Sequence, residues 1–253
     1  MKNNSKENLE ISKISANQNN EKFLKTNATD YIVSVLKGLL GIIPYAGSAA
    51  GEVVSWTIPN QRIDRISKYI EYIAKRIVKL ENTQKEWLEK LKNSKNNLLL
   101  FKLATKYSME TNSDILHHSY AYLVFNSIEN KTLDDSRNEK LLRTLSELTE
   151  EEIIHLINFS RNKALFSSSE FDKKYEDIIM PKSRTDHVLE NEIHNAFRNE
   201  YILTLEQKGL ITIIKRLDAN YPINTNDVRI TDYGNLLVEA IYDEEFFGKI
   251  NIR

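Results

Sequence analysis

Apolar residues recur at helical intervals through most of the chain, and the pattern is most regular after residue 60. There the spacing alternates between three and four residues in the series Ile63, Ile66, Ile70, Ile73, Ile77 and Leu80. Such alternation marks the seam that a helix buries against a neighbouring helix. Because the seam covers fewer than three heptads, it predicts a helix within an intramolecular bundle in preference to a free coiled coil.

Helical spacing continues after this seam, with short polar joints between the helices. The expected helices cover 87–104, 112–128, 138–148 and 149–159. Asn112 or Ser113 is suited to cap the second of them, and Thr149 with Glu152 has the spacing of a capping box at the fourth. We therefore expect a mainly α fold, with a helical multi-helix bundle domain over residues 30–180.

After Pro181 the pattern changes from helices alone to a mixture of helices and short strands. The expected elements are a helix over 186–207, a strand over 210–216, a second strand over 228–231 and a final helix over 232–241. Thr231 or Asp232 is suited to cap the final helix. Both strand segments are rich in β-branched residues, and the stretch between them is polar and turn-forming. This order of helix, strand, wing-like loop, strand and helix predicts a C-terminal winged-helix-like α/β unit over residues 186–253.

The segment 31–58 is apolar but unlike an ordinary soluble helix, because glycine and proline interrupt it. Its centre reads GLLGIIPYAGSAAG and holds four of the seven glycines of the chain. In a helix interior Gly costs roughly 1 kcal/mol and Pro roughly 3 kcal/mol relative to Ala. We expect a compact helical hairpin whose corner and close packing depend on Gly41, Pro44, Gly47 and Gly51.

The hairpin sequence excludes one binding mode and leaves two other readings open. A phosphate-binding loop has the pattern G-x-x-x-x-G-K-[ST], whereas five residues separate Gly41 from Gly47 and Ser48 follows without a lysine. The uncharged run of 14 residues is short for a membrane span. The segment is therefore either buried in the bundle, or it leaves the bundle to lie on or enter a membrane. In the second case the neighbouring basic helix would hold an anionic surface.

The first 29 residues are polar and rich in Asn and Lys, which predicts a mobile N-terminal arm. They contain no apolar core of a secretory signal, and the chain contains no cysteine. Disulfides, thiolate metal sites and thiol nucleophiles are thereby excluded. We expect a cytoplasmic protein, with a peripheral position at the inner membrane if the hairpin binds lipid.

The formal net charge of −1 conceals an asymmetry between two parts of the chain. Residues 62–106 hold 12 Lys and Arg against 5 Asp and Glu, whereas residues 111–253 hold 17 against 25. This asymmetry predicts either an acidic partner for the basic helices or ion pairing between the two parts. The candidate basic docking face comprises Arg62, Arg65, Lys68 and Arg76.

No motif in the sequence indicates catalysis, a metal site or a cofactor. Neither HExxH nor G-x-S-x-G occurs. His117 and His118 point in different directions on a helix, and His187 and His194 lie two turns apart, about 10 Å, so neither pair forms a simple chelate. The five histidines are expected to be surface or capping residues. We therefore predict a non-enzymatic protein without catalytic, cofactor-binding or metal-binding residues.

A winged-helix-like unit raises the question of nucleic-acid binding. Lys215, Arg216 and Arg229 are the candidate wing contacts. Nucleic-acid readers need a basic surface to meet phosphates, yet residues 186–253 hold 7 Lys and Arg against 12 Asp and Glu. The charge balance favours a structural or protein-binding unit over a reader of nucleic acid.

The order of these segments resembles a known group of proteins. The hairpin LLGIIPYAGSAAGEVVS is followed by IPNQRIDRISKYIEYIAKRI, a helical section, and a tail containing LEQKGLI and ITDYGNLLVEAI. This arrangement is similar to the small α-helical proteins of bacterial anti-phage and abortive-infection loci, the Abi-alpha type in particular. The resemblance covers residues 31–242 and implies a cytoplasmic, non-enzymatic defence protein that acts by interaction or by harming the host membrane. It implies no catalytic residues.

The leading hypothesis is a toxin-like defence protein in which the 31–58 hairpin is the working part. At rest the hairpin would pack against Ile66, Ile70 and Ile73, and a trigger would release it to disturb the inner membrane or to join other copies or a protein partner. Two alternatives stay open. One is a winged-helix nucleic-acid-binding regulator, and the other is an adaptor or scaffold subunit of a defence complex, with the basic helix docking an acidic partner.

Overall fold

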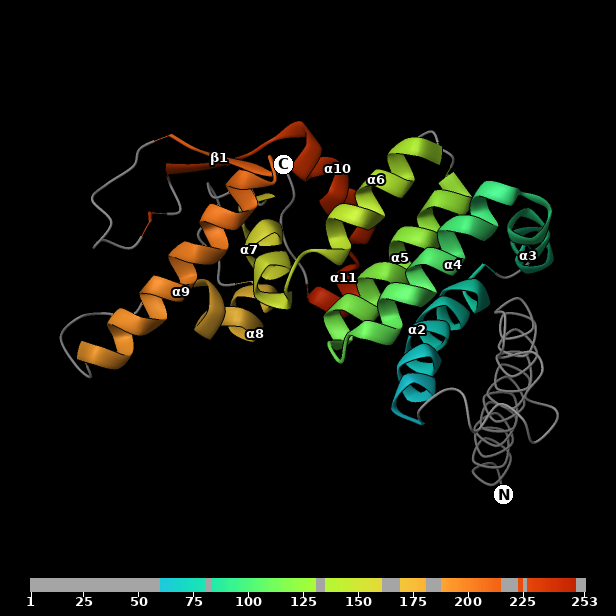
Figure 1. Cartoon of the computed structure of the whole chain (residues 1–253), viewed down its shortest axis with the longest axis horizontal. Coiled ribbons are helices and arrows are strands. Elements are labelled where there is room, and N and C mark those ends of the chain that lie inside the picture. The colour runs from blue at the N-terminus through green and yellow to red at the C-terminus, as the bar shows by residue number, and fades with distance from the viewer. Residues whose placement is uncertain are drawn as a thin grey trace, which may run out of the picture.

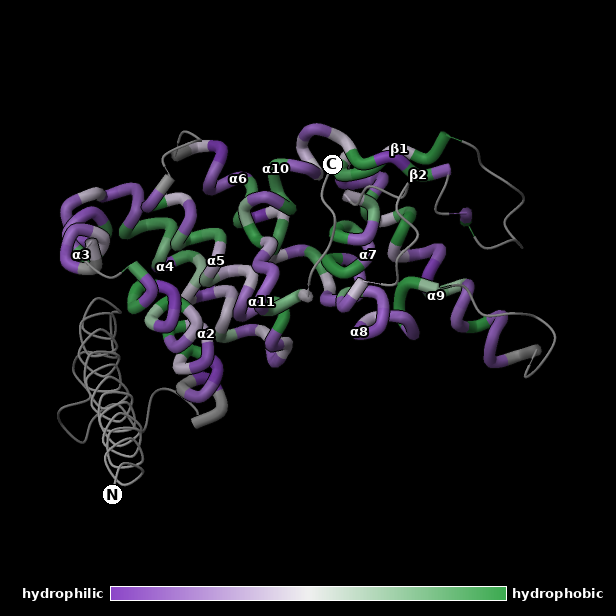
Figure 2. The backbone as a smooth tube through the Cα atoms, turned by 180° about the vertical axis from the view of Figure 1, so that it is seen from behind, coloured by the Kyte–Doolittle hydropathy of each residue, from purple (hydrophilic) through white to green (hydrophobic). Residues whose placement is uncertain are grey.

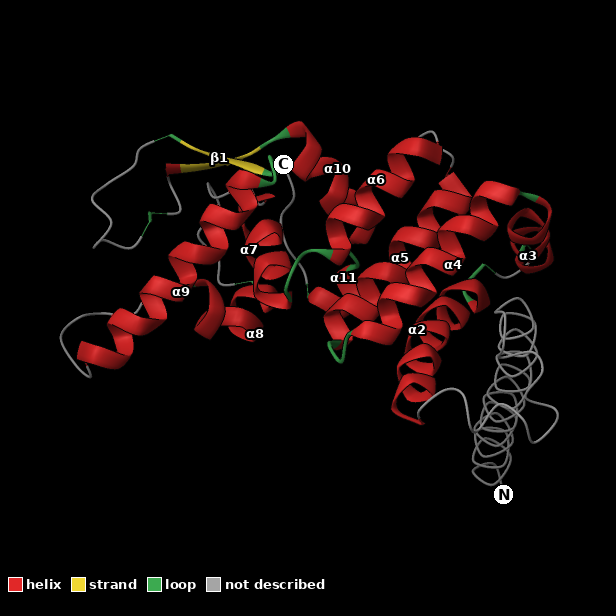
Figure 3. Cartoon of the chain, in the orientation of Figure 1, coloured by secondary structure: helices red, strands yellow, loops and turns green. Residues whose placement is uncertain are grey.

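The fold is mainly helical, with one small antiparallel sheet near the C-terminus (Figures 1 and 3). The computed structural model describes residues 60–80, 83–130, 135–160, 169–180, 188–214, 223–224 and 227–248. Its helices are α2 (Asn60–Val78), α3 (Gln84–Asn93), α4 (Lys95–Glu110), α5 (Asp114–Asn130), α6 (Asp135–Ser146), α7 (Glu150–Ser160), α8 (Glu170–Ile179), α9 (Val188–Gln207), α10 (Asp232–Ile241) and α11 (Glu244–Phe247). Its strands are β1 (Ile211–Ile213) and β2 (Val228–Ile230).

The apolar seam of α2 lies in the main core, where the helix packs against α5 and α4. Ile70, Ile73 and Ile77 are fully buried, and Ile66 is nearly so. The predicted intramolecular bundle contact is therefore confirmed for this helix. The expected seat of the 31–58 hairpin on the same seam lies outside the described residues, as do the arm over residues 1–29 and the hairpin itself.

The expected helix over 87–104 is divided by Ser94 into α3 and α4. The backbone of Ser94 is extended, and its hydroxyl accepts a hydrogen bond from the Asn97 amide at 3.2 Å. The Asn97 side chain in turn donates to the Lys90 carbonyl at 3.0 Å, so it satisfies an open acceptor at the end of α3. A serine that caps the second helix therefore overrides apolar periodicity that continues across the joint.

Three predicted helix starts are confirmed by their hydrogen bonds. Thr149 and Glu152 form a reciprocal capping box, with 2.8 Å from the Thr149 amide to the Glu152 carboxylate and 3.3 Å from the Glu152 amide to the Thr149 hydroxyl. The Ser113 hydroxyl accepts from the Leu116 amide at 3.3 Å, at the start of α5. The Thr231 hydroxyl accepts from the Gly234 amide at 3.0 Å, at the start of α10. Each donor would otherwise be unsatisfied in the first turn of a helix.

The C-terminal elements follow the expected order, but the strands are shorter than predicted. β1 and β2 have three residues each and pair antiparallel, with Thr212 opposite Arg229. α9 contacts β1, α7 contacts β2, and α10 packs against both α5 and α7. α10 therefore joins the strand-containing part to the helical bundle. The division into domains at residues 180–186 stays a prediction.

The described helices form an elongated arrangement. α9 projects at one end, whereas α2, α3 and α4 lie in the opposite half (Figure 1). Along most helices the tube alternates between hydrophobic and hydrophilic residues (Figure 2), as expected when one side of each helix faces the core. In the part of the chain that the structure describes, no helix combines the length and apolar character needed to cross a bilayer.

Candidate functional site

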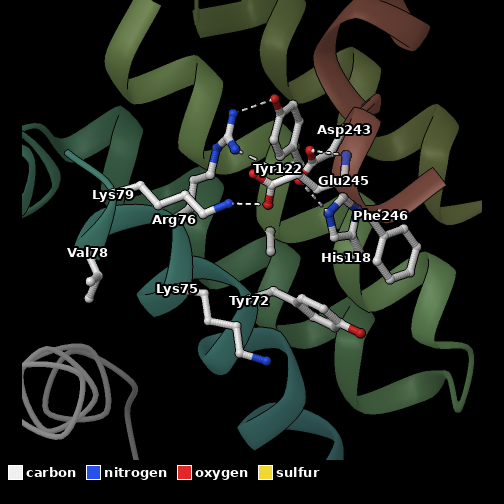
Figure 4. A pocket seen from close by; sticks show the side chains of 11 residues that line it. Tyr72, Lys75, Arg76, Val78, Lys79, His118, Tyr122, Asp243, Glu245 and Phe246 are labelled. Atoms are coloured by element: carbon white, nitrogen blue, oxygen red, sulfur yellow. Dashed lines mark hydrogen bonds and ion pairs between the residues drawn. The ribbon is translucent and has the colours of Figure 1, made fainter. Parts of the chain in front are cut away.

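A groove opens where α2, α5 and the segment around α11 meet (Figure 4). Its volume is about 410 Å³. It brings together cationic, aromatic and acidic side chains from segments far apart in the sequence. Its lining residues are Tyr72, Lys75, Arg76, Val78, Lys79, His118, Ala121, Tyr122, Asp243, Glu245 and Phe246. We call it the α2–α11 groove.

Arg76 of α2 is the central cation of this groove. Its Nη2 donates a hydrogen bond to the Tyr122 hydroxyl at 2.6 Å, and its Nη1 lies 3.9 Å from Asp243 Oδ2. The guanidinium lies over the Tyr122 ring, 4.6 Å from the centroid, and 5.7 Å from that of Phe125. Planar guanidinium groups suit this combination of stacking and directed hydrogen bonds, which a lysine ammonium could not reproduce.

Asp243 is the acidic counterpart, placed just before α11. It caps this short helix, because its Oδ1 accepts from the Glu245 amide at 3.1 Å, while Oδ2 lies 3.3 Å from His118 Nε2. Burial alone would raise the pKa of the Asp243 carboxyl. The hydrogen bonds from His118 and from the Glu245 amide, together with the charge of Arg76, outweigh burial and lower this pKa below its ordinary value. Asp243 is therefore an anion at neutral pH.

His118 is buried and acts as a structural donor. Burial lowers the pKa of its imidazole, and the nearby Asp243 only partly offsets this effect, so the ring is neutral at pH 7. An ionised carboxylate only accepts, which places the ring proton on Nε2, facing Asp243. Nδ1 is buried and has no hydrogen-bond partner among the described residues. A general base must reach a substrate proton, and the geometry of His118 leaves neither nitrogen open to the groove.

Aromatic rings close the groove around His118. Phe246 stacks on the imidazole with centroids 3.9 Å apart and planes inclined by 7°. Tyr72 meets both rings edge-on, at 5.2 Å from His118 and 5.7 Å from Phe246. Lys174 of α8 lies 5.0 Å over the Phe246 ring and donates to the Phe246 carbonyl at 2.6 Å. The α11 segment is thus held by the stack on His118 and by the contacts of Lys174 with the ring and carbonyl of Phe246.

Ion pairs at the rim link the basic helix to the acidic C-terminal segment. Lys79 pairs with Glu245, and Arg76 lies beside Asp243. Both contacts join α2 to residues more than 160 positions later in the chain. Of the two explanations for the charge asymmetry, pairing between the two parts therefore holds for Arg76 and Lys79.

The predicted basic docking face is largely engaged inside the molecule. Arg65 donates to the Asn112 side chain at 2.6 Å and to the Met109 carbonyl at 2.9 Å, and Lys68 pairs with Asp114 at 2.8 Å. With Arg76 bound to Tyr122 and Asp243, three of the four predicted cations tie α2 to other segments. Arg62 is exposed.

The remaining predicted site residues have different outcomes. Gly41, Pro44, Gly47 and Gly51 lie outside the described residues, as do Lys215 and Arg216. Arg229 is described and exposed, in the middle of β2. A shared wing surface of Arg229 with Lys215 and Arg216 therefore stays a prediction.

The expectation that the histidines lie at the surface is wrong for three of them. His117, His118 and His155 are buried. Burial lowers the pKa of His117 to about 4 and that of His155 to about 3, with neighbouring positive charges adding to both shifts. His117 lies on α5 and His155 on α7, and each neutral imidazole fills its buried position as an apolar ring would.

Sequence reasoning also missed α11, which supplies Glu245 and Phe246 to the groove. The signal was present in the run DEEFF, where an aspartate precedes two first-turn glutamates and two aromatic residues. A capping aspartate and acidic first turn are typical helix starts. The helix is only four residues long, so it presents too few positions for a periodic pattern.

Comparison with known proteins adds no relative. No family model, curated protein or solved structure matches this chain. Among the described residues, no three histidine, aspartate or glutamate side chains converge as a metal site would require. The α2–α11 groove is therefore interpreted from its own residues.

Proposed function

We propose that the protein is a non-enzymatic bacterial defence protein of the abortive-infection kind. It acts through protein interaction or through membrane disturbance by residues 31–58, and the described helices form the base from which that segment works. One observation carries the proposal. α2, the helix that directly follows the apolar segment, is anchored by its buried seam, by ties to α4 and α5, and by the Arg76 and Lys79 contacts to the α11 segment.

The free energy gained by burying the α2 isoleucines indicates that α2 stays fixed in the bundle. Removing a buried isoleucine side chain costs about 2 to 5 kcal/mol, and Ile70, Ile73 and Ile77 are all fully buried. Pulling α2 out of the bundle would expose all three side chains. The free-energy cost of that exposure exceeds the free energy that an exposed trigger contact supplies. Any release therefore begins N-terminal to α2, and α2 serves as the anchor.

The chemistry of the α2–α11 groove supports a non-enzymatic role. Its histidine directs one nitrogen to Asp243 and buries the other. Arg76 is stacked and hydrogen-bonded to Tyr122. A catalytic site normally aims such groups at the space that substrate occupies, whereas here they are aimed at one another. The groove is suited to holding the chain together.

The nucleic-acid alternative is the weaker one. In the winged-helix-like order of elements, α9 is the helix that precedes the strands and would enter a DNA groove. Its exposed residues include Glu190, Glu192, Glu200 and Phe197, and its single arginine, Arg198, is buried. Carboxylates on that helix would repel phosphates. A salt-dependent gel shift with random duplex DNA tests this alternative. Submicromolar binding at moderate salt would favour the regulator over the effector.

The proposed membrane action is tested by flotation and dye-leakage assays with the full chain and vesicles of anionic or neutral lipid. We expect binding and leakage with anionic vesicles, and loss of both in Gly47→Glu, which places a charge within the apolar run. The matched control is Thr212→Glu, at the exposed position of β1, which should behave as the parent protein.

A parallel plaque assay tests the defence role. Cells that express the parent chain should restrict phage or stop growing on infection, and cells that express Gly47→Glu should not. Equal restriction by the two chains would reject residues 31–58 as the working part. If no tested phage is restricted and no vesicle is bound, the proposed function is wrong.

A further inference from the structure

The exposed side of α9 carries large apolar side chains. Phe197 is 60% exposed and Ile193 is 49% exposed. They lie four residues apart, so they fall on the same side of the helix, with Glu200 one turn beyond Phe197. Isolated exposed apolar residues are ordinary at protein surfaces, whereas Ile193 and Phe197 adjoin each other on a helix that projects from the described part of the chain. We call these three residues the α9 stripe.

The exposed side of α4 carries the opposite charge around its own apolar residue. Leu99 is 48% exposed. Lys95, Lys102 and Lys106 are exposed on the same side, at four residues before Leu99 and at three and seven after it. None of these lysines forms an ion pair with another part of the described chain. We call this set, with Leu99, the α4 stripe.

A hollow lies beside Leu99, between α4 and α6, and has a volume of about 220 Å³. Leu99 and Leu100 are its apolar lining residues, and the others are Asn96, Asn97, Ser136, Asn138 and Glu139. A cavity of about 150 Å³ holds benzene, so the hollow is large enough for a phenyl ring placed against the two leucines. Glu139 on its α6 wall is already bound by Arg143 at 2.6 Å, which leaves the lysines as the dominant charge.

The two stripes match in spacing. Ile193, Phe197 and Glu200 occupy positions i, i+4 and i+7, and Lys95, Leu99 and Lys102 occupy the same three positions on α4. Each set therefore extends about 10 Å along its helix. With Phe197 seated beside Leu99, Glu200 comes within reach of Lys102 if the two helices run parallel, and of Lys95 if they run antiparallel. α9 contains no lysine, and α4 contains a single acidic residue, Glu110 at its end, so the charges of the two helices are complementary.

The two stripes cannot meet within one molecule. α9 projects at one end of the described chain, and α4 lies in the other half (Figures 1 and 2). We infer that the occupant of the α4 stripe is the α9 stripe of a second copy of this chain. Because the two surfaces differ, the contact is head-to-tail, and it extends into a chain or closes into a ring.

The association should be weak and sensitive to salt. A contact between two helix stripes is smaller than the roughly 1,200 to 2,000 Å² that stable interfaces bury. Its charges are solvent-exposed, so salt screens them. Self-association is therefore expected from micromolar to millimolar protein concentration at low salt. This inference does not depend on the proposed function, since neither stripe involves residues 31–58.

Sedimentation velocity over a concentration series tests the contact with the full chain. The parent protein should form growing oligomers at low salt, and these should dissociate at high salt. Phe197→Gln and Leu99→Gln, each at an exposed position, should each weaken association about tenfold or more, because central apolar residues dominate such contacts. Ile214→Gln is the matched control, since Ile214 is equally exposed but lies at the end of β1, and it should associate as the parent does. Circular dichroism checks that each variant is folded.

Mixing the two variants gives the decisive result. Phe197→Gln retains an intact α4 stripe, and Leu99→Gln retains an intact α9 stripe. At a concentration near the dissociation constant of the parent protein, each variant alone should be largely monomeric, whereas the mixture should form a one-to-one dimer that grows no further. Glu200→Lys mixed with Lys102→Glu should likewise associate better than either alone. A parent protein that stays monomeric at millimolar concentration would overturn the inference, as would a mixture that stays monomeric, or Leu99→Gln that associates as well as the parent.

Discussion

Phe246 and His118 stack face to face, with ring centroids 3.9 Å apart, although 128 positions separate them in the sequence. His118 belongs to the buried bundle, and Phe246 belongs to a helix of four residues that cannot be stable alone. The stack therefore fixes α11 onto the bundle, together with the Asp243 contacts to His118 and Arg76.

Phe246→Ala should lower the free energy of unfolding by about 2 kcal/mol, because it removes a half-buried ring and the stack of that ring on His118. Urea denaturation monitored by circular dichroism measures this change. Phe197→Ala is the matched control at low protein concentration, since that ring is 60% exposed and surface substitutions usually change stability by about 0.5 kcal/mol or less. Equal losses in the two variants would contradict the anchoring role of Phe246.

Arg76 and Lys79 should differ in their importance, although both pair with the α11 segment. Lys79→Gln removes an ion pair between exposed side chains, and such pairs contribute about 0.2 to 1 kcal/mol. Arg76→Gln also removes the hydrogen bond to the Tyr122 hydroxyl, the stack on its ring and the positive charge beside the partly buried Asp243, so we expect a loss of about 2 kcal/mol. Denaturation at low and high salt measures both. The Lys79 effect should disappear at high salt, and the Arg76 effect should persist. A reversed order would show that the exposed pair is the stronger link.

Acid should destabilise the protein through its buried histidines. In the folded state the pKa of His155 is about 3 and that of His117 about 4, below the ordinary 6.5 of an accessible imidazole. The unfolded chain therefore binds more protons between these values, so stability is complete above pH 6.5 and falls as the pH drops towards 3. Each histidine contributes a slope of up to about 1.4 kcal/mol per pH unit.

His155→Leu isolates one of these two contributions. Neither ring nitrogen of His155 has a hydrogen-bond partner among the described residues, so an apolar side chain of similar size should change stability at pH 7 by less than about 1.5 kcal/mol. Between pH 6 and pH 4 the variant should lose stability less steeply than the parent, by about 1.4 kcal/mol per pH unit at most. Urea midpoints across this range measure the slope. An unchanged slope would mean that His155 is not buried as a neutral ring.

Two glycines should respond differently to a methyl group. A Cβ on Gly234 would lie 2.1 Å from the Leu210 carbonyl oxygen and 2.8 Å from Ile230 Cγ1. Gly234→Ala must therefore push α10 away from the strands, at a cost of about 3 kcal/mol or more. A Cβ on Gly209 meets nothing within 4 Å, but its φ of +70° costs an alanine roughly 1 to 2 kcal/mol. Thermal and urea unfolding distinguish the two, and a smaller loss for Gly234→Ala would contradict the close packing.

The bundle was predictable where packing and capping leave local signals. The seam of α2 follows from its isoleucines, and the starts of α5, α7 and α10 follow from Ser113, Thr149 and Thr231. The break at Ser94 was missed because the apolar spacing continues across it, so a single hydroxyl decides the boundary. β1 and β2 were expected to be longer, because β-branched composition continues beyond the residues that pair.

The groove was not predictable, because no local pattern links its parts. Arg76 and Tyr122 lie on different helices, and Asp243 precedes a helix too short to show periodicity. The basic character of α2 was visible in the sequence, but the choice between an external partner and internal pairing depends on where α11 lies. The burial of three histidines was not predicted for the same reason, because the sequence does not show whether an imidazole is exposed to solvent.

The late position of the α11 segment has a consequence for the order of folding during synthesis. Glu245 follows its partner Lys79 by 166 residues, and a ribosome adds about 5 to 20 residues per second. The groove beside α2 and α5 therefore stays uncovered for roughly 10 to 30 s after α2 has been made. During that interval Arg76 and the aromatic residues around His118 are accessible to other chains. The docking of Asp243 and Phe246 covers this surface, so that neighbouring nascent proteins can no longer bind it.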